Sequence, residues 1–218
     1  MSSLQTILED MPQGDHLCSI YRTREEQLSV IIPYMLGGLK MNEACIYILD
    51  DRTGKEICYY VTKAWSENSL ELKRNQWKFL VKEDAYLREG YFDPDKMIAL
   101  LRETEEEATR GGFAGLRATG EMTWIFSKLP GTEKLIEYES KLNLFLPGSR
   151  SRAICQYDEN RFDEDILLKV IYTHPKVLLY GNLFDNPFFI PPEHFDRTVE
   201  ERKGKQDYRS LVKELLKS

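Results

Sequence analysis

Polar side chains that could bind a small ligand are concentrated in the segment GLRATGEMTW, residues 115–124. Arg117 supplies a guanidinium, Glu121 a carboxylate and Trp124 an aromatic face. If the turn in this segment brings the three groups together, they would line one pocket. The same residues also fit an Arg–Glu ion pair beside a core tryptophan, and the sequence leaves these two interpretations open.

A second candidate is the segment YESKLN, residues 138–143, in which Glu139 and Asn143 are four residues apart. This spacing places both side chains on one face of a helix. Leu135 and Leu142 mark the buried side of that helix, and Glu139 borders it. We therefore expect an inward-facing carboxylate at Glu139.

Histidines and cysteines give a third candidate. His16 and Cys18 are two residues apart, so on a strand they point to the same side. Cys155 and His174 lie near later strands, which makes a metal-binding cluster conceivable, but the spacing matches no familiar zinc signature. The favoured interpretation is buried thiols and hydrogen-bonded histidines, so we predict no metal and no cofactor.

The scaffold that positions these groups alternates strands with helices. Continuous apolar runs predict six strands, at residues 17–21, 44–49, 78–81, 113–118, 152–157 and 176–181. Helical periodicity predicts five helices between them, at residues 25–39, 53–64, 94–110, 132–144 and 163–171. This alternation is typical of an α/β fold with three layers, in which helices cover both faces of a mainly parallel central sheet.

Local signals define the ends of the helices. Thr23 with Glu26 predicts a capping box at the start of the first helix, and Thr53 with Glu56 predicts another at the start of the second. Pro33 predicts a kink in the first helix, because a proline inside a helix removes a hydrogen bond. We expect this helix to end at Gly37-Gly38, residues 182–197 to be irregular, and a terminal helix to follow residue 198.

The turn between the first strand and the first helix occupies the position of a phosphate loop. Such a loop needs glycines and a lysine, whereas residues 21–25 contain neither. This turn cannot wrap a triphosphate, but it can form the wall of a small pocket. We therefore expect Tyr21 and Thr23 to border a ligand that lies beyond the carboxyl ends of the strands, between this turn and residues 117–124.

Composition narrows the class of protein. The 218 residues carry a formal net charge of −6, so there is no excess of cations for nucleic acid or an anionic membrane surface. No run approaches the roughly 18 apolar residues that a membrane span requires. We expect a cytoplasmic protein with reduced cysteines, in which residues 1–13 are an extension, 14–197 the domain and 198–218 a tail.

Several motifs together resemble one family. The stretches are DHLCSIYRTREE, GEMTW, YESKLN, ICQYD, HPKVL and NPFFIPP, in that order along the chain. They resemble the MEDS domain, the methanogen/methylotroph DcmR-type sensory domain, over about residues 14–192. The resemblance implies a module that detects small hydrocarbon derivatives, such as methylated or halogenated one-carbon compounds. It also implies a RecA-like core, similar to the recombinase-type ATPase core of circadian-clock proteins, that lacks the phosphate loop.

The resemblance also implies functional residues. Its pattern singles out ten positions in this chain: His16, Cys18, Tyr21, Glu121, Trp124, Glu139, Asn143, Cys155, Tyr157 and His174. The predicted ligand site contains these residues except Cys155. It also contains Thr23 and Arg117. The segment NPFFIPP, residues 186–192, either closes over the mouth of a pocket or packs on the edge of the sheet.

The leading functional hypothesis is a sensor without catalytic activity. It would bind a small molecule and relay the signal to a protein partner, a kinase or a transcription regulator, without contacting nucleic acid directly. One alternative is a nucleotide-dependent or acid/base enzyme, with Glu121 or Glu139 as base and His174 as acid. The other is a pure interaction module that forms a homodimer through its terminal helix.

Overall fold

The core of the protein is a seven-stranded sheet, seen in a computed structural model that describes residues 3–49, 54–67 and 73–217. The strand order is β3-β2-β4-β5-β1-β6-β7. Every neighbouring pair is parallel except the antiparallel pair β6 and β7. The strands are β1 (His16–Tyr21), β2 (Ala44–Ile48), β3 (Trp77–Leu80), β4 (Leu116–Glu121), β5 (Ser151–Asp158), β6 (Lys176–Leu179) and β7 (Asn182–Asp185).

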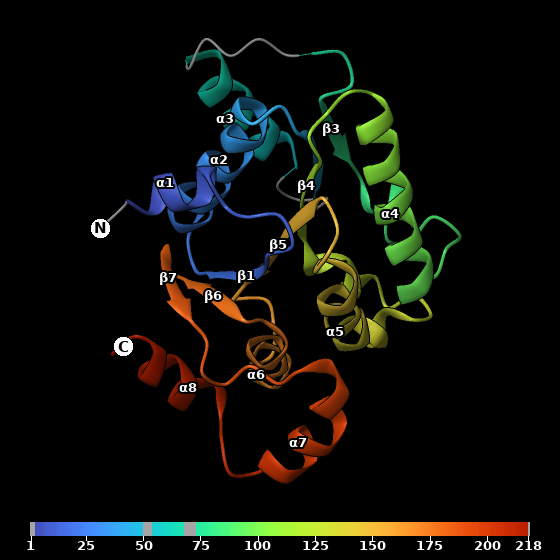
Figure 1. Ribbon diagram of the computed structural model, residues 1–218. Coiled ribbons are helices and arrows are strands. Elements are labelled where there is room, and N and C mark those ends of the chain that lie inside the picture. Colours follow the sequence, from blue (N-terminus) through green and yellow to red (C-terminus); the bar gives the residue numbers. More distant parts are fainter. Residues whose placement is uncertain (1–2, 50–53, 68–72, 218) are drawn as a thin grey trace.

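Helices cover both faces of this sheet, as Figure 1 shows. One face packs against α1 (Leu4–Glu9), α2 (Arg24–Lys40) and α3 (Gly54–Glu67). The other face packs against α4 (Pro94–Arg110), α5 (Leu135–Phe145), α6 (Glu164–Thr173) and α8 (Tyr208–Leu215), while α7 (Phe195–Arg202) lies near the C-terminus. The predicted fold class, a three-layer α/β fold with a mainly parallel sheet, is confirmed.

The start of α2 has the predicted capping box. The Thr23 hydroxyl accepts from the Glu26 amide at 3.2 Å, and the Glu26 carboxylate accepts from the Arg22 amide at 2.7 Å. The carboxylates of Glu25 and Glu26 lie in the first turn. The positive end of this helix is therefore already neutralised by its own side chains. The predicted cap of the second helix at Thr53 lies outside the described residues.

The end of α2 differs from the prediction, because the helix passes through Pro33 and both glycines and continues to Lys40. A Cβ atom on Gly37 would lie 2.4 Å from the Glu9 carbonyl oxygen. A Cβ atom on Gly38 would lie 2.4 Å from the Cys45 sulfur. The two glycines thus let α1 and β2 approach the helix closely, and they are not a stop signal.

Three further features depart from the predicted pattern. Helix α1 lies in the segment expected to be an extension, and β7 lies in the segment expected to be irregular. The fourth strand spans Leu116–Glu121, three residues later than predicted. The terminal helix α8 is present, and its apolar side, including Tyr208 and Leu211, is buried against the core. In the described part of the chain, none of the helices is long and apolar enough to cross a membrane.

Candidate functional site

Arg117 belongs to a buried ion-pair cluster with Glu43 and Arg152, which we call the arginine cluster. Arg117 Nε donates to Glu43 Oε2 at 2.7 Å, and Arg152 Nη2 donates to the other oxygen of the same carboxylate. Arg117 Nη1 also donates to the backbone carbonyls of Tyr34 and Leu8, at 2.6 and 3.0 Å. Arg117 therefore ties α1 and α2 to the sheet.

Glu121 and Trp124 lie apart from that cluster. Glu121 ends β4, where it accepts a hydrogen bond from the Tyr47 hydroxyl at 3.4 Å, and the same hydroxyl donates to Gln156 at 3.1 Å. Trp124 stacks on Tyr86 on the opposite face of the sheet, with ring centroids 4.9 Å apart. The structure thus does not gather Arg117, Glu121 and Trp124 around one pocket. Arg117 and Glu121 lie on the same face of β4 but about 13 Å apart along the strand, and the turn after β4 takes Trp124 to the other face.

Four side chains converge on the opposite face of the sheet from the arginine cluster. We call His16, Glu139, Cys155 and His174 the histidine cluster, and their ligand-type atoms all lie within 4.8 Å of one another. His16 begins β1, Cys155 lies in β5, Glu139 lies in α5, and His174 follows α6. Because β1 lies between β5 and β6, the strand order brings together residues that are distant in the sequence. All four are buried.

The distances within the histidine cluster are short. Glu139 Oε2 lies 3.1 Å from His16 Nε2 and 3.3 Å from His174 Nε2. The Cys155 sulfur lies 3.6 Å from His16 Nε2. Neither Glu139 Oε2 nor His174 Nε2 has a hydrogen-bond partner among the described residues, although both atoms are fully enclosed. Each of these four residue types can ligate a transition metal.

The outer nitrogens of both histidines are held in place. His16 Nδ1 lies 3.0 Å from Asn143 Oδ1, and the Asn143 amide nitrogen donates to the carbonyls of Glu139 and Thr173 at 3.1 and 2.7 Å. The amide oxygen must therefore face His16, so His16 Nδ1 is the donor. His174 Nδ1 lies 2.7 Å from the Val170 carbonyl, which can only accept. Both histidines thus carry the Nδ1 proton and direct Nε2 into the cluster.

The surroundings lower the pKa values of His16 and Glu139 and raise the pKa of His174. Burial and the nearby His174 lower the pKa of His16. Burial acts in the same way on His174, but the thiols of Cys18 and Cys155 and the Glu139 carboxylate outweigh it and raise its pKa. Burial raises the pKa of Glu139, but the two histidines outweigh it and hold that pKa well below its usual range.

Other predicted residues surround this cluster. The Tyr157 hydroxyl donates to Glu139 Oε1. Cys18 is the register partner of Cys155 across β1 and β5, and its thiol also interacts with His174. Thr23 caps α2, and Tyr21 is buried at the carboxyl end of β1. Of the eleven predicted ligand-binding residues, six lie in or against the histidine cluster: His16, Cys18, Glu139, Asn143, Tyr157 and His174.

A cavity of about 270 Å³ adjoins the histidine cluster. His16 and Asn143 line its inner part, and Phe189 and Pro192 line it from the segment NPFFIPP. The cavity lies at the amino ends of β1 and β6, opposite the predicted position beyond the carboxyl ends. The remaining lining residues are Gly14, Asp15, Pro147, Pro175 and Lys176.

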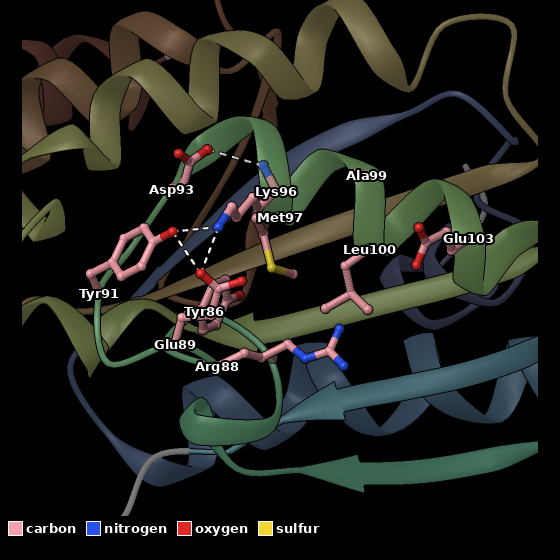
Figure 2. Close-up of a pocket in the computed structure, with 11 residues that line it drawn as sticks. Tyr86, Arg88, Glu89, Tyr91, Asp93, Lys96, Met97, Ala99, Leu100 and Glu103 are labelled. Carbon is pink, nitrogen blue, oxygen red and sulfur yellow. Dashed lines mark hydrogen bonds and ion pairs between the residues drawn. The ribbon is translucent and has the colours of Figure 1, made fainter.

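A larger cavity of about 510 Å³ lies between the segment 85–93 and α4, as Figure 2 shows. Three of its polar groups pair with one another: Lys96 donates to Glu89 at 2.6 Å, and both contact the Tyr91 hydroxyl. The cavity contains none of the predicted site residues. These three polar groups are therefore paired, in contrast to Glu139 Oε2 and His174 Nε2, which have no hydrogen-bond partner among the described residues.

Sequence reasoning left out several buried polar residues. Cys155 was set aside from the predicted ligand site, and the partners Glu43, Arg152 and Gln156 were missed. A signal was present for two of them, since Arg152 and Gln156 interrupt the otherwise apolar strand RAICQY. A charge inside such a strand is costly unless it is paired, so it indicates a buried partner.

The chain belongs to the MEDS family, a class of sensory domains: the model of the MEthanogen/methylotroph, DcmR Sensory domain matches residues 15–175. The predicted family is thus confirmed. Among curated proteins, the transcriptional repressor DcmR of Methylorubrum extorquens is 26% identical over 175 residues. The match covers 78% of this chain and 62% of the repressor, so the chain spans less than two thirds of the length of that relative.

Two solved structures have a similar arrangement of elements. The KaiC-like protein from Pyrococcus horikoshii matches with a TM-score of 0.49 and 11% identity, over 77% of this chain and 71% of that chain. The flagellar accessory protein FlaH from Methanocaldococcus jannaschii matches with a TM-score of 0.47 and 10% identity, over 79% and 76%. These matches concern the overall fold alone.

Proposed function

We propose that this chain is the ligand-sensing part of a regulatory system and that it binds a small hydrocarbon derivative in the cavity beside the histidine cluster. The observation that carries the proposal is the combination of an apolar wall at Phe189 with polar groups at His16 and Asn143. A few polar groups in a mostly apolar concave site are the usual composition of a small-molecule pocket. Membership of a sensory family supports the same conclusion.

The size of the cavity limits the ligand. Pockets for drug-sized molecules measure about 300–1,000 Å³, whereas this cavity measures about 270 Å³. A methylated or halogenated one-carbon compound fits this volume, and a nucleotide does not. The self-capped start of α2 supports the same distinction, because Glu26 already accepts the amide that a phosphate would need.

A route for the signal runs through the segment NPFFIPP. Asn186 Nδ2 donates to the carbonyls of Ile171 and His174 at 2.6 and 2.7 Å, and the Ile190 amide donates to the Tyr172 carbonyl at 2.8 Å. The outer wall of the cavity is therefore attached to the backbone that carries His174. A ligand that displaces Phe189 would alter this attachment and, beyond it, the position of the C-terminal helices.

The partner is proposed to be a transcription regulator or a kinase. The curated relative is named a transcriptional repressor, and 38% of its length (100 − 62) lies outside the match. We propose that DNA contact, where it occurs, belongs to a part of the system outside the matched region. The sensor itself would hydrolyse no nucleotide.

Calorimetry with methylamines, methyl thiols and chloromethanes tests the proposal. At least one of these compounds should bind and raise the melting temperature, because a ligand that binds only the folded state stabilises it. Phe189→Ala should weaken that binding by roughly fivefold, since partial burial of a phenyl ring contributes about 1 kcal/mol. ATP in the same assay should neither bind nor be hydrolysed.

The matched control is Arg88→Ala, which alters the larger cavity and should leave binding unchanged. If no compound stabilises the protein at concentrations well above a millimolar dissociation constant, the ligand class is wrong. If binding depends on Arg88 and not on Phe189, the site is wrong.

A further inference from the structure

The histidine cluster has the dimensions of a metal site. In tetrahedral zinc sites the Zn–N and Zn–O bonds are about 2.0–2.1 Å and the Zn–S bond about 2.3 Å, which separates ligands by about 3.3 Å, or about 3.6 Å for nitrogen and sulfur. The cluster shows 3.1 and 3.3 Å between nitrogen and oxygen, and 3.6 Å between nitrogen and sulfur. Three of the six separations among the four donor atoms thus match those around a single central ion, and all six are within 4.8 Å.

The hydrogen-bond network directs lone pairs at that centre. Asn143 and the Val170 carbonyl hold the protons of both histidines on Nδ1, so Nε2 of His16 and of His174 face Glu139 Oε2. When neither ring carries a second proton, three atoms that can all accept therefore lie close together. Such an arrangement is repulsive unless a cation lies between them.

A proton alone satisfies this arrangement incompletely. If His174 carried a proton on Nε2, that proton should form a hydrogen bond to Glu139 Oε2. Among the described residues both atoms instead lack a hydrogen-bond partner, although they lie 3.3 Å apart. A central ion would satisfy both orphaned atoms and the His16 nitrogen together.

We propose that His16, Glu139, Cys155 and His174 bind one divalent transition-metal ion in a tetrahedral site. Two imidazoles, a carboxylate and a thiol form a donor set of intermediate softness, which suits Zn²⁺ and excludes Mg²⁺ and Ca²⁺. This inference stands apart from the proposed function, since it concerns the empty protein and requires no organic ligand.

The surroundings support the assignment. Metal-bound histidines usually donate their other ring proton to a carbonyl or carboxylate, as both histidines do here. The ligating carboxylate is itself oriented, because Tyr157 donates to Glu139 Oε1 and leaves Oε2 free for the ion. Access for an ion runs through the cavity of about 270 Å³, whose wall includes His16.

The test is metal analysis of the full chain without an affinity tag. Elemental mass spectrometry of protein dialysed against Zn²⁺ should give one equivalent per chain. Replacement by Co²⁺ should give the intense visible bands of tetrahedral Co²⁺ and a near-ultraviolet thiolate-to-metal band. Glu139→Gln and His174→Gln should reduce the bound metal to less than a tenth of an equivalent, and Cys155→Ser should abolish the thiolate band.

Matched controls exist within the chain. His194 is exposed, and Cys58 lies in α3 on the other face, so His194→Gln and Cys58→Ser should retain a full equivalent and unchanged spectra. If a cluster variant does not fold, as judged by circular dichroism, the wild-type Co²⁺ spectrum decides. Folded wild-type protein that shows no tetrahedral Co²⁺ bands with excess Co²⁺ overturns the proposal, and so does metal binding that survives both Glu139→Gln and His174→Gln.

Failure of this test differs from failure of the proposed function. The metal measurements use Zn²⁺ and Co²⁺ alone, whereas the function is tested with one-carbon compounds and Phe189→Ala. If the chain binds Co²⁺ but no organic compound, the metal site stands and the proposed organic ligand is wrong. If the chain binds an organic compound but no Co²⁺, the proposed sensor stands and the histidine cluster has a purely structural role.

Discussion

The two buried clusters of this protein lie on opposite faces of one sheet and are built from opposite kinds of atoms. In the arginine cluster, guanidinium N–H groups surround one carboxylate, and Arg117 fills its remaining donors with backbone carbonyls. In the histidine cluster, ring nitrogens, a carboxylate oxygen and a sulfur surround a common centre. Both clusters are buried, so burial by itself does not distinguish a structural cluster from a functional one.

The unpartnered atoms make the distinction. In the arginine cluster, Arg152 Nε and Nη1 have no hydrogen-bond partner in the part of the chain that the structure describes, and both are N–H donors that would suit an anion or a water molecule. In the histidine cluster, Glu139 Oε2 and His174 Nε2 have no hydrogen-bond partner among the described residues, and both can ligate a cation. The type of atom left over, and not the number of charges, indicates what a buried site can bind.

The largest expected effect is at the centre of the arginine cluster. Glu43→Gln leaves two buried arginines without a countercharge, so it should lower the free energy of unfolding by roughly 3–5 kcal/mol. Urea denaturation measures this change. Glu9→Gln is the control, because Glu9 pairs with Lys40 nearer the surface and its loss should cost less than about 1 kcal/mol. Equal effects of the two substitutions would remove the structural role assigned to Glu43.

Metal removal should have the next largest effect, and it concerns only the histidine cluster. With free Zn²⁺ 100-fold above the dissociation constant, binding stabilises the fold by about 2.7 kcal/mol. At about 2–4 °C per kcal/mol for a domain of this size, chelation should lower the melting temperature by roughly 5–10 °C. Differential scanning calorimetry with and without a chelator measures the shift. Glu139→Gln should show no such shift, and a shift of normal size in that variant would contradict the assignment.

A smaller effect distinguishes a residue that orients a metal ligand from a residue that only stabilises the fold. Tyr157→Phe removes the hydroxyl that orients Glu139, so metal affinity should fall roughly tenfold. Tyr34→Phe is the matched change on the opposite face of the sheet, where the hydroxyl donates to the carbonyls of Ala118 and Arg152 at 3.0 Å. Each substitution should cost about 1 kcal/mol of stability, because each removes buried hydrogen bonding. Competition with a colorimetric chelator should show weaker metal binding only for Tyr157→Phe.

The smallest effect is at Thr23, which lies in neither cluster. Thr23→Ala removes the cap of α2 and should lower the free energy of unfolding by about 1 kcal/mol. Metal content and the binding of one-carbon compounds should stay unchanged, as calorimetry would measure. Weaker binding of the compounds with unchanged stability would instead restore Thr23 to the ligand site.

Much of the fold could be predicted from local sequence, because its signals are local. Strands such as ACIYIL are continuous apolar runs, and Thr23 with Glu26 marks the start of a helix within four residues. The misses have physical reasons as well. The short elements α1 and β7 bury few side chains, and Gly37-Gly38 has the sequence of a helix end although it serves close packing.

The site depended on information that local patterns do not contain. Arg117 and Glu121 were grouped with Trp124 because they are neighbours in sequence, yet their partners Glu43 and Tyr47 come from β2 and the turn before it. The histidine cluster requires the strand order, since only a β1 strand between β5 and β6 places His16 beside Cys155 and His174. The residues and their spacing indicated a conceivable cluster of histidines and cysteines and, separately, an inward-facing Glu139. The resemblance to a family singled out the same residues, but neither indicated that they meet.

The outer ligands of the histidine cluster, His16 and His174, are 158 residues apart (174 − 16), nearly the full span of the family match. An ion held by both would cross-link the two ends of the domain without a covalent bond. Closing so long a loop removes much of the entropy of the unfolded chain. The ion would therefore raise the free energy of unfolding of the whole domain, and hydrogen exchange in strands far from the cluster would report its arrival and its loss.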